Sequence, residues 1–528
     1  MLVLFQGFLE QQFKRISTKE GEPVRKGSRA SAYVGSVGAT TAVLASLEWI
    51  RIRPSSPLEF LYLSLLSIAL VPVSILFLST LVYVATRQPR FPRAAVAAWP
   101  RVAVLYVAYN DVLPQAIRLT LRNVDYPNAE IWLLSDSTHA DAIALEEALP
   151  PSVRVFRRPS RRGGKAGIIN DWLRSHAANV RYVVPMDSDA ILAPGSLRTL
   201  VEIAEHPSNR RYAGFQTLME IHPAVAPTAF GRILGPGVKW GSRILPLANQ
   251  RIFGQAMYWG SNALLRPDVV LASGGWVENN ICEDFALTAS LDAAGHPIAL
   301  VDIYNYEGFP PDALSLRERT TRWCKANLAL FPTVIRAKTS FAVRLNVTIP
   351  LLFYLMAPVL ISLLLVNIVA PPEMPLHRWS TTLGGSLLVF VFLHRLVAVP
   401  RNRVDLIQFG IMLLAETVVI LSMSLRVAWC FVESLVRAPS WLPSRKLARR
   451  LLVRDAIRAS VPEVAFGVLL VLLSIAYRAS FPSVALASVW TVSFVLTPMI
   501  LWLSFGPRKP STSSVQPPRD RSERRISS

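Results

Sequence analysis

Two aspartates one residue apart, Asp187 and Asp189, follow the short apolar, β-branched run at 182–186. In a β-strand, residues i and i+2 point to the same face, so two such carboxylates at a strand end can converge on one hard cation. Mg²⁺ prefers oxygen ligands and is typically bound by one or two carboxylates together with substrate phosphates. The pattern therefore indicates a site for a metal-bound diphosphate. The alternative is a solvated turn, in which Asp and Ser are ordinary residues.

A basic, glycine-containing loop at 161–167 carries Lys165 and precedes a helical pattern. Glycines let a backbone approach a diphosphate closely, and the N-terminus of a helix favours an anion. The spacing is not that of a Walker A loop, which also requires a Ser or Thr after the Lys. Lys165 is thus a candidate diphosphate ligand, with a plain surface turn as the alternative.

Glu283 and Asp284 begin another helical pattern. Acidic residues in a first helical turn often only complement the helix dipole. A general base must reach the proton that it removes, so Asp284 qualifies if this helix start faces the Asp187 crevice.

Arg319, Arg322 and Trp323 lie close together after an apparent loop at 308–313. The indole could stack on a pyranose ring, and the arginines could pair with phosphate. An amphipathic helix at a membrane surface with snorkelling arginines is the alternative.

Strand-length apolar runs alternate with helical patterns between residues 100 and 335. We expect strands at 102–107, 131–134, 153–156 and 182–186, and helices at 113–124, 140–149 and 166–176. Strand–helix alternation predicts an α/β domain with a mostly parallel sheet, and such sheets bind ligands at the carboxyl ends of their strands. Asp111, Asp136 and the Asp187/Asp189 pair all follow strands, so we expect them to face one crevice.

Composition indicates an integral membrane protein. Of the 528 residues, 52% are hydrophobic, and they gather in long runs near both ends. The net charge of +21 comes mostly from Lys and Arg beside these runs and in the tail, which is the positive-inside pattern. We therefore expect a lipid bilayer, and no nucleic acid, as a partner. The three cysteines match no metal-ligand spacing.

The expected order is a basic cytoplasmic N-terminus at 1–29, two transmembrane helices at 30–86, the α/β domain at 100–335, a transmembrane bundle at 342–505 and a disordered basic tail at 506–528. The expected spans within it lie at 31–50, 58–85, 342–369, 380–398, 461–477 and 482–504. Charge asymmetry places the α/β domain and both termini in the cytoplasm.

The apolar stretch 404–431 does not fit a simple count of spans. If the basic stretches 400–403 and 437–458 and the tail are all cytoplasmic, this stretch cannot cross the membrane once. We expect a re-entrant or interfacial segment with its charged residues buried against protein or water, and a plain span as the alternative.

In order, these motifs resemble those of the family-2, GT-A-fold membrane glycosyltransferases, the group that contains cellulose and hyaluronan synthases. The family pattern is a single Asp, Lys-Ala-Gly, Asp-x-Asp, Thr-Glu-Asp and Gln-x-x-Arg-Trp. It stands here as Asp136, 165–167, 187–189, 282–284 and 319–323, with Cys282 in place of Thr and Arg319 in place of Gln. The resemblance covers all of 100–335 and implies a GT-A nucleotide-diphospho-sugar transferase domain inserted between transmembrane α-helices.

The resemblance also implies roles for the matching residues. The nucleotide sugar would contact Asp136, Lys165 and Asp187, and the metal, Mg²⁺ or Mn²⁺, would be held by Asp187 and Asp189. From its position after a strand, we expect Asp111 to contact the nucleotide sugar as well. Asp284 would be the general base, and the acceptor and diphosphate would contact Glu283, Arg319, Arg322 and Trp323.

Two segments, 258–263 and 317–328, resemble most the subgroup that makes the β-1,2-linked backbone of osmoregulated periplasmic glucans, although Ser261 replaces a His. This implies an enzyme of the bacterial inner membrane that transfers glucose from UDP-glucose to a glucan acceptor and exports the product, with a periplasmic glucan-modifying protein as a further partner. A cellulose-synthase-like or lipid-acceptor transferase is the enzymatic alternative. A transporter or scaffold with a degenerate transferase domain is the alternative of another class.

Overall fold

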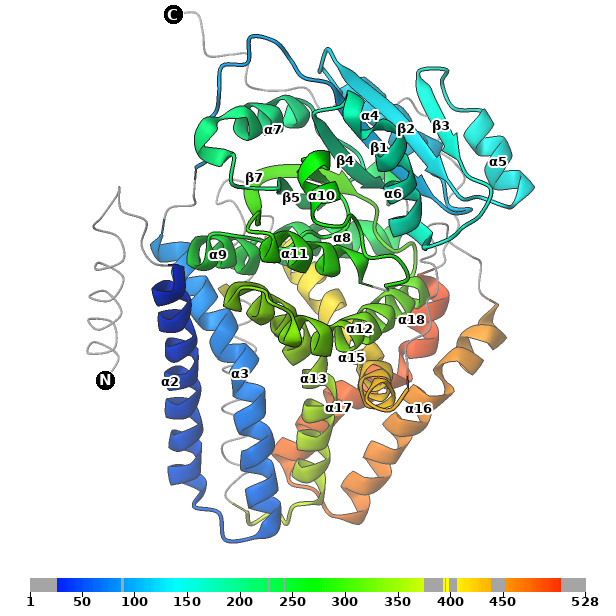
Figure 1. Cartoon of the computed structure of the whole chain (residues 1–528). Coiled ribbons are helices and arrows are strands. Elements are labelled where there is room, and N and C mark those ends of the chain that lie inside the picture. Colours follow the sequence, from blue (N-terminus) through cyan, green and yellow to red (C-terminus); the bar gives the residue numbers. More distant parts are fainter. Residues whose placement is uncertain are drawn as a thin grey trace, which may run out of the picture.

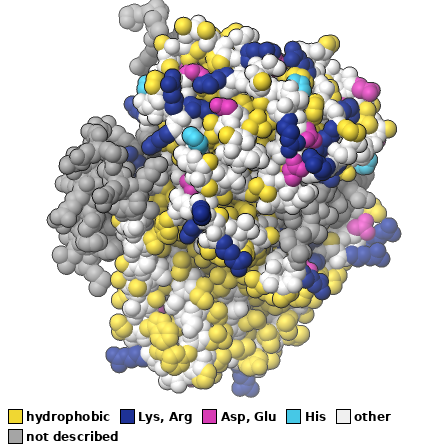
Figure 2. Space-filling model, viewed as in Figure 1, with side chains coloured by type: hydrophobic (Ala, Val, Ile, Leu, Met, Phe, Trp, Pro, Cys, Tyr) yellow, Lys and Arg dark blue, Asp and Glu magenta, His cyan; other side chains and the backbone are white. Residues whose placement is uncertain are grey.

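The computed structural model describes residues 26–86, 90–226, 228–241, 243–280, 282–374, 393–394, 396–397, 406–437 and 452–504. An α/β domain stands above a set of long helices (Figure 1). On the face shown in Figure 2, charged side chains gather over the α/β domain and hydrophobic ones over the long helices. The two regions thus differ in surface chemistry as the sequence predicts.

A mixed seven-stranded sheet forms the centre of the α/β domain, in the order β3-β2-β1-β4-β6-β5-β7. The strands are β1 (Val102–Ala108), β2 (Ala129–Ser135), β3 (Val153–Arg157), β4 (Tyr182–Asp187), β5 (Gly214–Ile221), β6 (Ala263–Leu265) and β7 (Ile298–Glu307). Strands β1 to β4 are parallel, as predicted, whereas β6 runs antiparallel to both β4 and β5. The parallel strands therefore bring their carboxyl ends to one edge.

The α/β domain contains the following helices, several of which cover the two faces of the sheet. They are α4 (Pro114–Asn123), α5 (Ala140–Glu147), α6 (Gly164–His176), α7 (Ser196–Glu205), α8 (Ala229–Gly241), α9 (Ile244–Phe253), α10 (Pro267–Ala272), α11 (Glu283–Ala293) and α12 (Ala313–Arg336). The first three coincide with the helices expected from the sequence. β1 and the first five residues of β4 are apolar and almost wholly buried, which is typical of central parallel strands.

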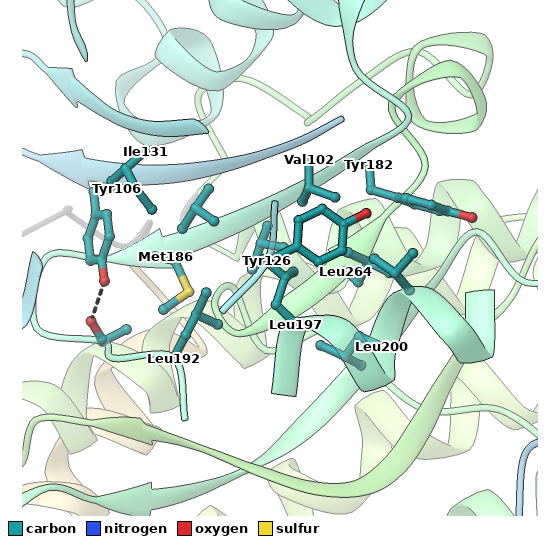
Figure 3. Close-up of a cluster of buried hydrophobic side chains, with 14 of the residues drawn as sticks. Val102, Tyr106, Tyr126, Ile131, Tyr182, Met186, Leu192, Leu197, Leu200 and Leu264 are labelled. Atoms are coloured by element: carbon teal, nitrogen blue, oxygen red, sulfur yellow. Dashed lines mark hydrogen bonds between the residues drawn. The ribbon is translucent and has the colours of Figure 1, made fainter. Parts of the chain in front are cut away.

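One face of the sheet packs against α4 and α7 and forms a core that Figure 3 shows in part. Tyr106 of β1 reaches across this core, and its hydroxyl donates to the carbonyl of Ala190, 2.9 Å away. The opposite face packs against α6 and α11 through Trp172, Leu287 and other apolar side chains. Both faces together hold β4 rigidly, and β4 ends at Asp187.

Five long helices carry most of the remaining chain: α2 (Lys26–Ile52), α3 (Pro57–Ala85), α13 (Phe341–Val369), α15 (Leu406–Ser434) and α16 (Val453–Ala476). Two shorter ones, α17 (Phe481–Val495) and α18 (Thr497–Leu503), form a pair bent by 41°. Among the described residues, α3, α13, α15 and α16 are each long and apolar enough to cross a membrane, and the bent pair could make a fifth span.

The expected first span at 31–50 lies inside α2, which is helical and packs along α3 but is not among those four apolar helices. A capping box at Ser56 and Glu59 begins α3. The expected span at 380–398 falls almost wholly outside the described residues.

The stretch 404–431 corresponds to α15, an uninterrupted helix that is itself apolar enough to cross a membrane. It packs against α8 and α12 of the α/β domain as well as against α13. Its course through or along a bilayer stays a prediction. Arg426 does lie against protein, since its Nε is 2.9 Å from the Glu463 carboxylate.

Candidate active site

The centre of the candidate site is an ion pair between two predicted residues. Nζ of Lys165, at the start of α6, lies 2.5 Å from Oδ1 of Asp187 at the end of β4. The same ammonium donates to the carbonyl of Gly260, at 2.9 Å. Burial alone would lower the pKa of Lys165, but the charges of Asp187, Glu283 and Asp284 outweigh it and hold that pKa above its usual value. Lys165 is therefore a fixed cation among carboxylates.

Gly260 brings the base candidate close to this ion pair. Its φ is +86°, a conformation that favours glycine, and a Cβ there would lie 3.4 Å from Oδ2 of Asp284 and 3.7 Å from Nζ of Lys165. The Gly260 backbone thus lies between the side chains of Asp284 and Lys165. The start of α11 therefore lies close to Lys165, the ion-pair partner of Asp187.

Glu283 and Asp284 form a pair of carboxylates with raised pKa values. Burial, followed by the charge of Asp284, raises the pKa of Glu283 to about 7. Burial also raises the pKa of Asp284, against the hydrogen bond from the Phe285 N–H and the charge of Lys165. Proton affinity near neutral pH is a property that a general base needs.

The second aspartate of the Asp-x-Asp pair, Asp189, is buried. It lies against Gly308, where a Cβ would come within 2.4 Å of its Oδ2, so a glycine is needed for this close approach. Between the two aspartates, Ser188 donates to Oδ2 of Asp111 at 3.2 Å, and Asp111 also accepts from the Tyr109 N–H at 2.8 Å. Asp111, after β1, thus borders the Asp-x-Asp turn.

The side chain of Asp136 is buried, and its carboxylate is paired with an arginine. Both of its oxygens accept from Arg158, at 2.8 and 2.7 Å, and both side chains are 5% exposed. Arg158 also binds Asp171 at 2.9 Å. Asp136 follows β2 as predicted, but its principal partner is an arginine that the sequence argument did not single out.

The residues of the Arg-Trp motif lie on α12. The Arg319 guanidinium sits between the Phe309 and Trp323 rings, 5.5 and 4.7 Å from their centroids. Burial lowers its pKa to about 10, against the charges of Glu307 and Asp189. The Trp323 side chain is 47% exposed and so is free to stack on a sugar.

Arg322 faces the acidic cluster from the same helix. Burial lowers its pKa, and the charges of Asp187, Glu283 and Asp284 oppose that change. The arginine therefore lies within electrostatic reach of all three carboxylates. Within the described part of the chain, Nε of Arg319 is a buried donor without a hydrogen-bond partner, which leaves it available to a ligand.

Three structurally important residues were missed at the sequence level: Arg158, Gly260 and Gly308. Gly260 falls within the segment 258–263 and Gly308 begins the loop 308–313, but neither glycine is predicted to contact a carboxylate. No local signal links Arg158 to Asp136, because the contact joins two strand ends that meet only when the sheet forms. The Asp-x-Asp pattern itself carries no information on which backbone segment approaches it.

The donor set suits a hard divalent cation. Among the described residues, no group of three or more His, Cys, Asp or Glu side chains is placed to hold a metal by itself. Two carboxylates, Asp187 and Asp189, with the remaining positions left to diphosphate oxygens, are what Mg²⁺ commonly uses in proteins. The residues present therefore fit Mg²⁺ or Mn²⁺ bound together with a substrate.

A sheet of this order, with acidic side chains at the carboxyl ends of its parallel strands, defines a GT-A nucleotide-sugar transferase domain. Residues 103–258 match the model of glycosyl transferase family 2. The model of glycosyl transferase family group 2 matches residues 182–505, which is more than half of the chain. The chain therefore belongs to glycosyl transferase family group 2.

Similar proteins include two named glucans biosynthesis glucosyltransferase H. The one from Bradyrhizobium diazoefficiens is 27% identical over 360 residues, covering 58% of this chain and 46% of that protein. The one from Xylella fastidiosa is 25% identical over 313 residues, covering 52% of this chain and 48% of that protein. The chain thus spans about half the length of these relatives.

Among solved structures, a mannosyltransferase from Pyrobaculum calidifontis in complex with GDP-Man and Mn²⁺ matches 63% of this chain and 97% of its own, at 17% identity and a TM-score of 0.46. The glucosyl-3-phosphoglycerate synthase from Mycobacterium tuberculosis matches 44% of this chain at 18% identity, with a TM-score of 0.31.

Proposed function

We propose that this chain is an inverting membrane glycosyltransferase that transfers glucose from UDP-glucose to a growing β-glucan. Membership of glycosyl transferase family group 2 supports the reaction class. Similarity to proteins named glucans biosynthesis glucosyltransferase H supports a glucan product. The apolar helices on both sides of the α/β domain support a membrane location.

One observation carries the mechanism: Lys165 joins Asp187 and the Gly260 backbone directly beside Asp284. A fixed cation, the end of an Asp-x-Asp strand and a carboxylate of raised pKa thus share one crevice. This is the arrangement required for a donor diphosphate to lie next to a group that accepts a proton.

The donor would lie along the strand ends. Asp111 and Asp136 would border the nucleoside, and Lys165 would bind the diphosphate opposite Asp187. A divalent cation, held by Asp187 and Asp189, would neutralise diphosphate charge. Arg322 and the buried Arg319 add positive charge on the other side of the crevice, where the leaving UDP gains negative charge.

Asp284 would take the proton from an acceptor hydroxyl. The oxygen of that hydroxyl forms a bond to the anomeric carbon, while the bond from that carbon to the phosphate oxygen breaks and its electron pair leaves with UDP. Attack from the side opposite the leaving group inverts the anomeric configuration. Glu283 and the exposed Trp323 would position the acceptor sugar.

The reaction would take place on the cytoplasmic side of the bacterial inner membrane, with both termini in the cytoplasm. The helices that follow α12 would form a path for the product. The product would then pass to a periplasmic glucan-modifying protein.

The decisive experiment is turnover in isolated membranes with radiolabelled UDP-glucose and Mg²⁺ or Mn²⁺, beside the Asp284→Asn variant. A metal-dependent polymer that the variant does not make is the expected result, and its linkage is then determined. A short labelled product that partitions with lipid would favour the lipid-acceptor alternative. Absence of transfer from UDP-glucose and from every other nucleotide sugar would overturn the proposal and favour a scaffold or transporter.

A further inference from the structure

Helix α12 carries polar side chains on two opposite sides. At about 100° per residue, Arg319, Arg322 and Trp323 share one side, which faces the candidate active site. Arg317, Thr321 and Lys325 are spaced four residues apart and share the other side. The two sides are separated by roughly half a turn of the helix. Any rotation of α12 about its axis therefore moves the side chains that face the candidate active site together with those on the opposite side of the helix.

The opposite side of α12 meets a buried carboxylate of α16. Oε1 of Glu463 lies 3.4 Å from Nη1 of Arg317 and 2.9 Å from Nε of Arg426 on α15. Both guanidinium groups also donate to the carbonyl of Ala459, at 3.1 and 3.4 Å. The Glu463 side chain is 0% exposed. One carboxylate thus joins three helices, α12, α15 and α16.

Further along the same side, α12 makes two more polar contacts with α15. The Cys430 thiol donates to the carbonyl of Thr321 at 3.3 Å, and Nζ of Lys325 lies 3.1 Å from the carboxylate of Glu433. The α15 residues are spaced four and three apart, which is the spacing of one helix face. We call these contacts, together with those of Glu463, the α12–α15 seam.

The seam is sensitive to the loss of one charge. Removing one partner of a buried ion pair is strongly destabilising because the remaining charge stays buried without compensation. Without the Glu463 charge, Arg317 and Arg426 would be two like charges facing each other. We expect α12 to turn or shift so that the two guanidinium groups move apart, since Arg317 lies near the N-terminal end of α12.

We propose that the α12–α15 seam sets the rotation of α12, and that Glu463 is a positioning residue for Arg319, Arg322 and Trp323. This inference rests on the proposed function for its activity readout. Lys165 and Asp187, which would bind the donor diphosphate, come from α6 and β4 and do not depend on the seam, whereas Arg319 and Arg322 come from α12. A shift of α12 should therefore impair sugar transfer more than it weakens the binding of UDP.

The test compares Glu463→Gln with Asp455→Asn, an isosteric change at a partly exposed carboxylate of the same helix. For Glu463→Gln we expect kcat to fall roughly 10- to 100-fold, with a smaller rise in the Kd of UDP. The double variant Glu463→Gln/Arg426→Gln restores the original net charge of the group formed by Glu463, Arg317 and Arg426. It should therefore regain part of the lost turnover. Asp455→Asn should match the unchanged chain.

A second readout needs no turnover, so it separates this inference from the proposed function. Cys324 is 0% and Cys430 3% exposed. Both should resist maleimide in the unchanged chain and react in Glu463→Gln, as mapped by peptide mass spectrometry. Turnover of Glu463→Gln within about twofold of the unchanged chain, or unreacted cysteines in that variant, would overturn the proposal.

If Glu463→Gln does not accumulate in membranes, Glu433→Gln replaces it. This change removes the partly exposed contacts of Glu433 with Lys325 and with Arg437, so the fold should persist. A smaller loss of turnover and a slower gain in Cys430 labelling are expected. No change in either measurement would then overturn the proposal.

Discussion

Two carboxylates of the α/β domain, Asp136 and Asp284, have different partners. Both Asp136 oxygens bind Arg158, within a pair that is almost wholly buried. Asp284 has no arginine bound to it in this way, and burial raises its pKa. A carboxylate held by a guanidinium is a permanent acceptor of hydrogen bonds, whereas one with a raised pKa can take up a proton. On this comparison we propose a binding role for Asp136 and a catalytic role for Asp284.

The largest expected effect is that of Asp284→Asn. An amide cannot accept the proton, so kcat should fall roughly 10²- to 10⁴-fold while UDP binding persists. The matched variant Asp136→Asn should raise the KM of the donor more than it lowers kcat. Steady-state kinetics in membranes measures both, and the reverse assignment of effects would contradict the comparison.

Arg158→Met tests whether the buried pair of Arg158 and Asp136 holds this part of the domain together. It leaves Asp136 and Asp171 without their shared buried cation, which should cost about 3–5 kcal/mol of stability. Thermal unfolding of the detergent-solubilised protein measures this loss. The control is Arg162→Met, an arginine 66% exposed whose nearest carboxylate atoms are 3.8 and 3.9 Å away. It should cost less than about 1 kcal/mol.

The pH dependence of kcat tests the proposed role of Asp284 as the general base. The pKa of Glu283 is raised to about 7 and that of Asp284 is also raised. The Glu283–Asp284 pair therefore takes up protons as the pH falls below neutral, and a protonated Asp284 can no longer accept a proton from the acceptor hydroxyl. We expect kcat to fall by up to tenfold per pH unit on the acidic side.

Glu283→Gln should move this acidic limb to lower pH, because removing a neighbouring negative charge favours the ionised form of Asp284. A profile of kcat against pH for both proteins measures the shift. A limb that stays in place, or a rate that does not change from about pH 8 to about pH 6, would contradict the assignment of the pair.

The smallest expected effect concerns Gly260. Gly260→Ala places a Cβ 3.4 Å from the Asp284 carboxylate, and the φ of +86° adds backbone strain. The control Gly254→Ala has a similar φ of +68° but nothing within 4 Å of the added Cβ. Both should cost roughly 1–2 kcal/mol of stability, but only Gly260→Ala should lower kcat, by roughly threefold to tenfold. Equal kinetics of the two variants would show that this contact does not matter for catalysis.

Local patterns predicted much of the fold. The four expected strands correspond to β1 to β4 within a few residues. The runs of β1 and β4 are almost wholly buried, whereas β3, at the edge of the sheet, is mostly exposed. The strands β5, β6 and β7 were not predicted, and β6 is only three residues long. So short a strand forms through pairing with β4 and β5, which no local pattern contains.

The membrane region was predicted less evenly. The spans at 58–85 and 342–369 coincide with α3 and α13 within one residue at each end. α16 begins at Val453, inside the stretch expected to be a basic cytoplasmic segment. The helical pattern continues through Arg454 and Arg458 because their long side chains can reach the surface of the bundle.

The sequence by itself determined which groups are present at the strand ends: Asp111, Asp136, and the Asp187/Asp189 pair. It did so because strand and helix periods are local and place residues on faces without reference to the rest of the chain. Only the tertiary structure decided that Lys165 binds Asp187, that Arg158 closes over Asp136 and that Gly260 lies against Asp284. These contacts join residues brought together by the order of strands and the packing of helices on them, and that order follows from long-range burial.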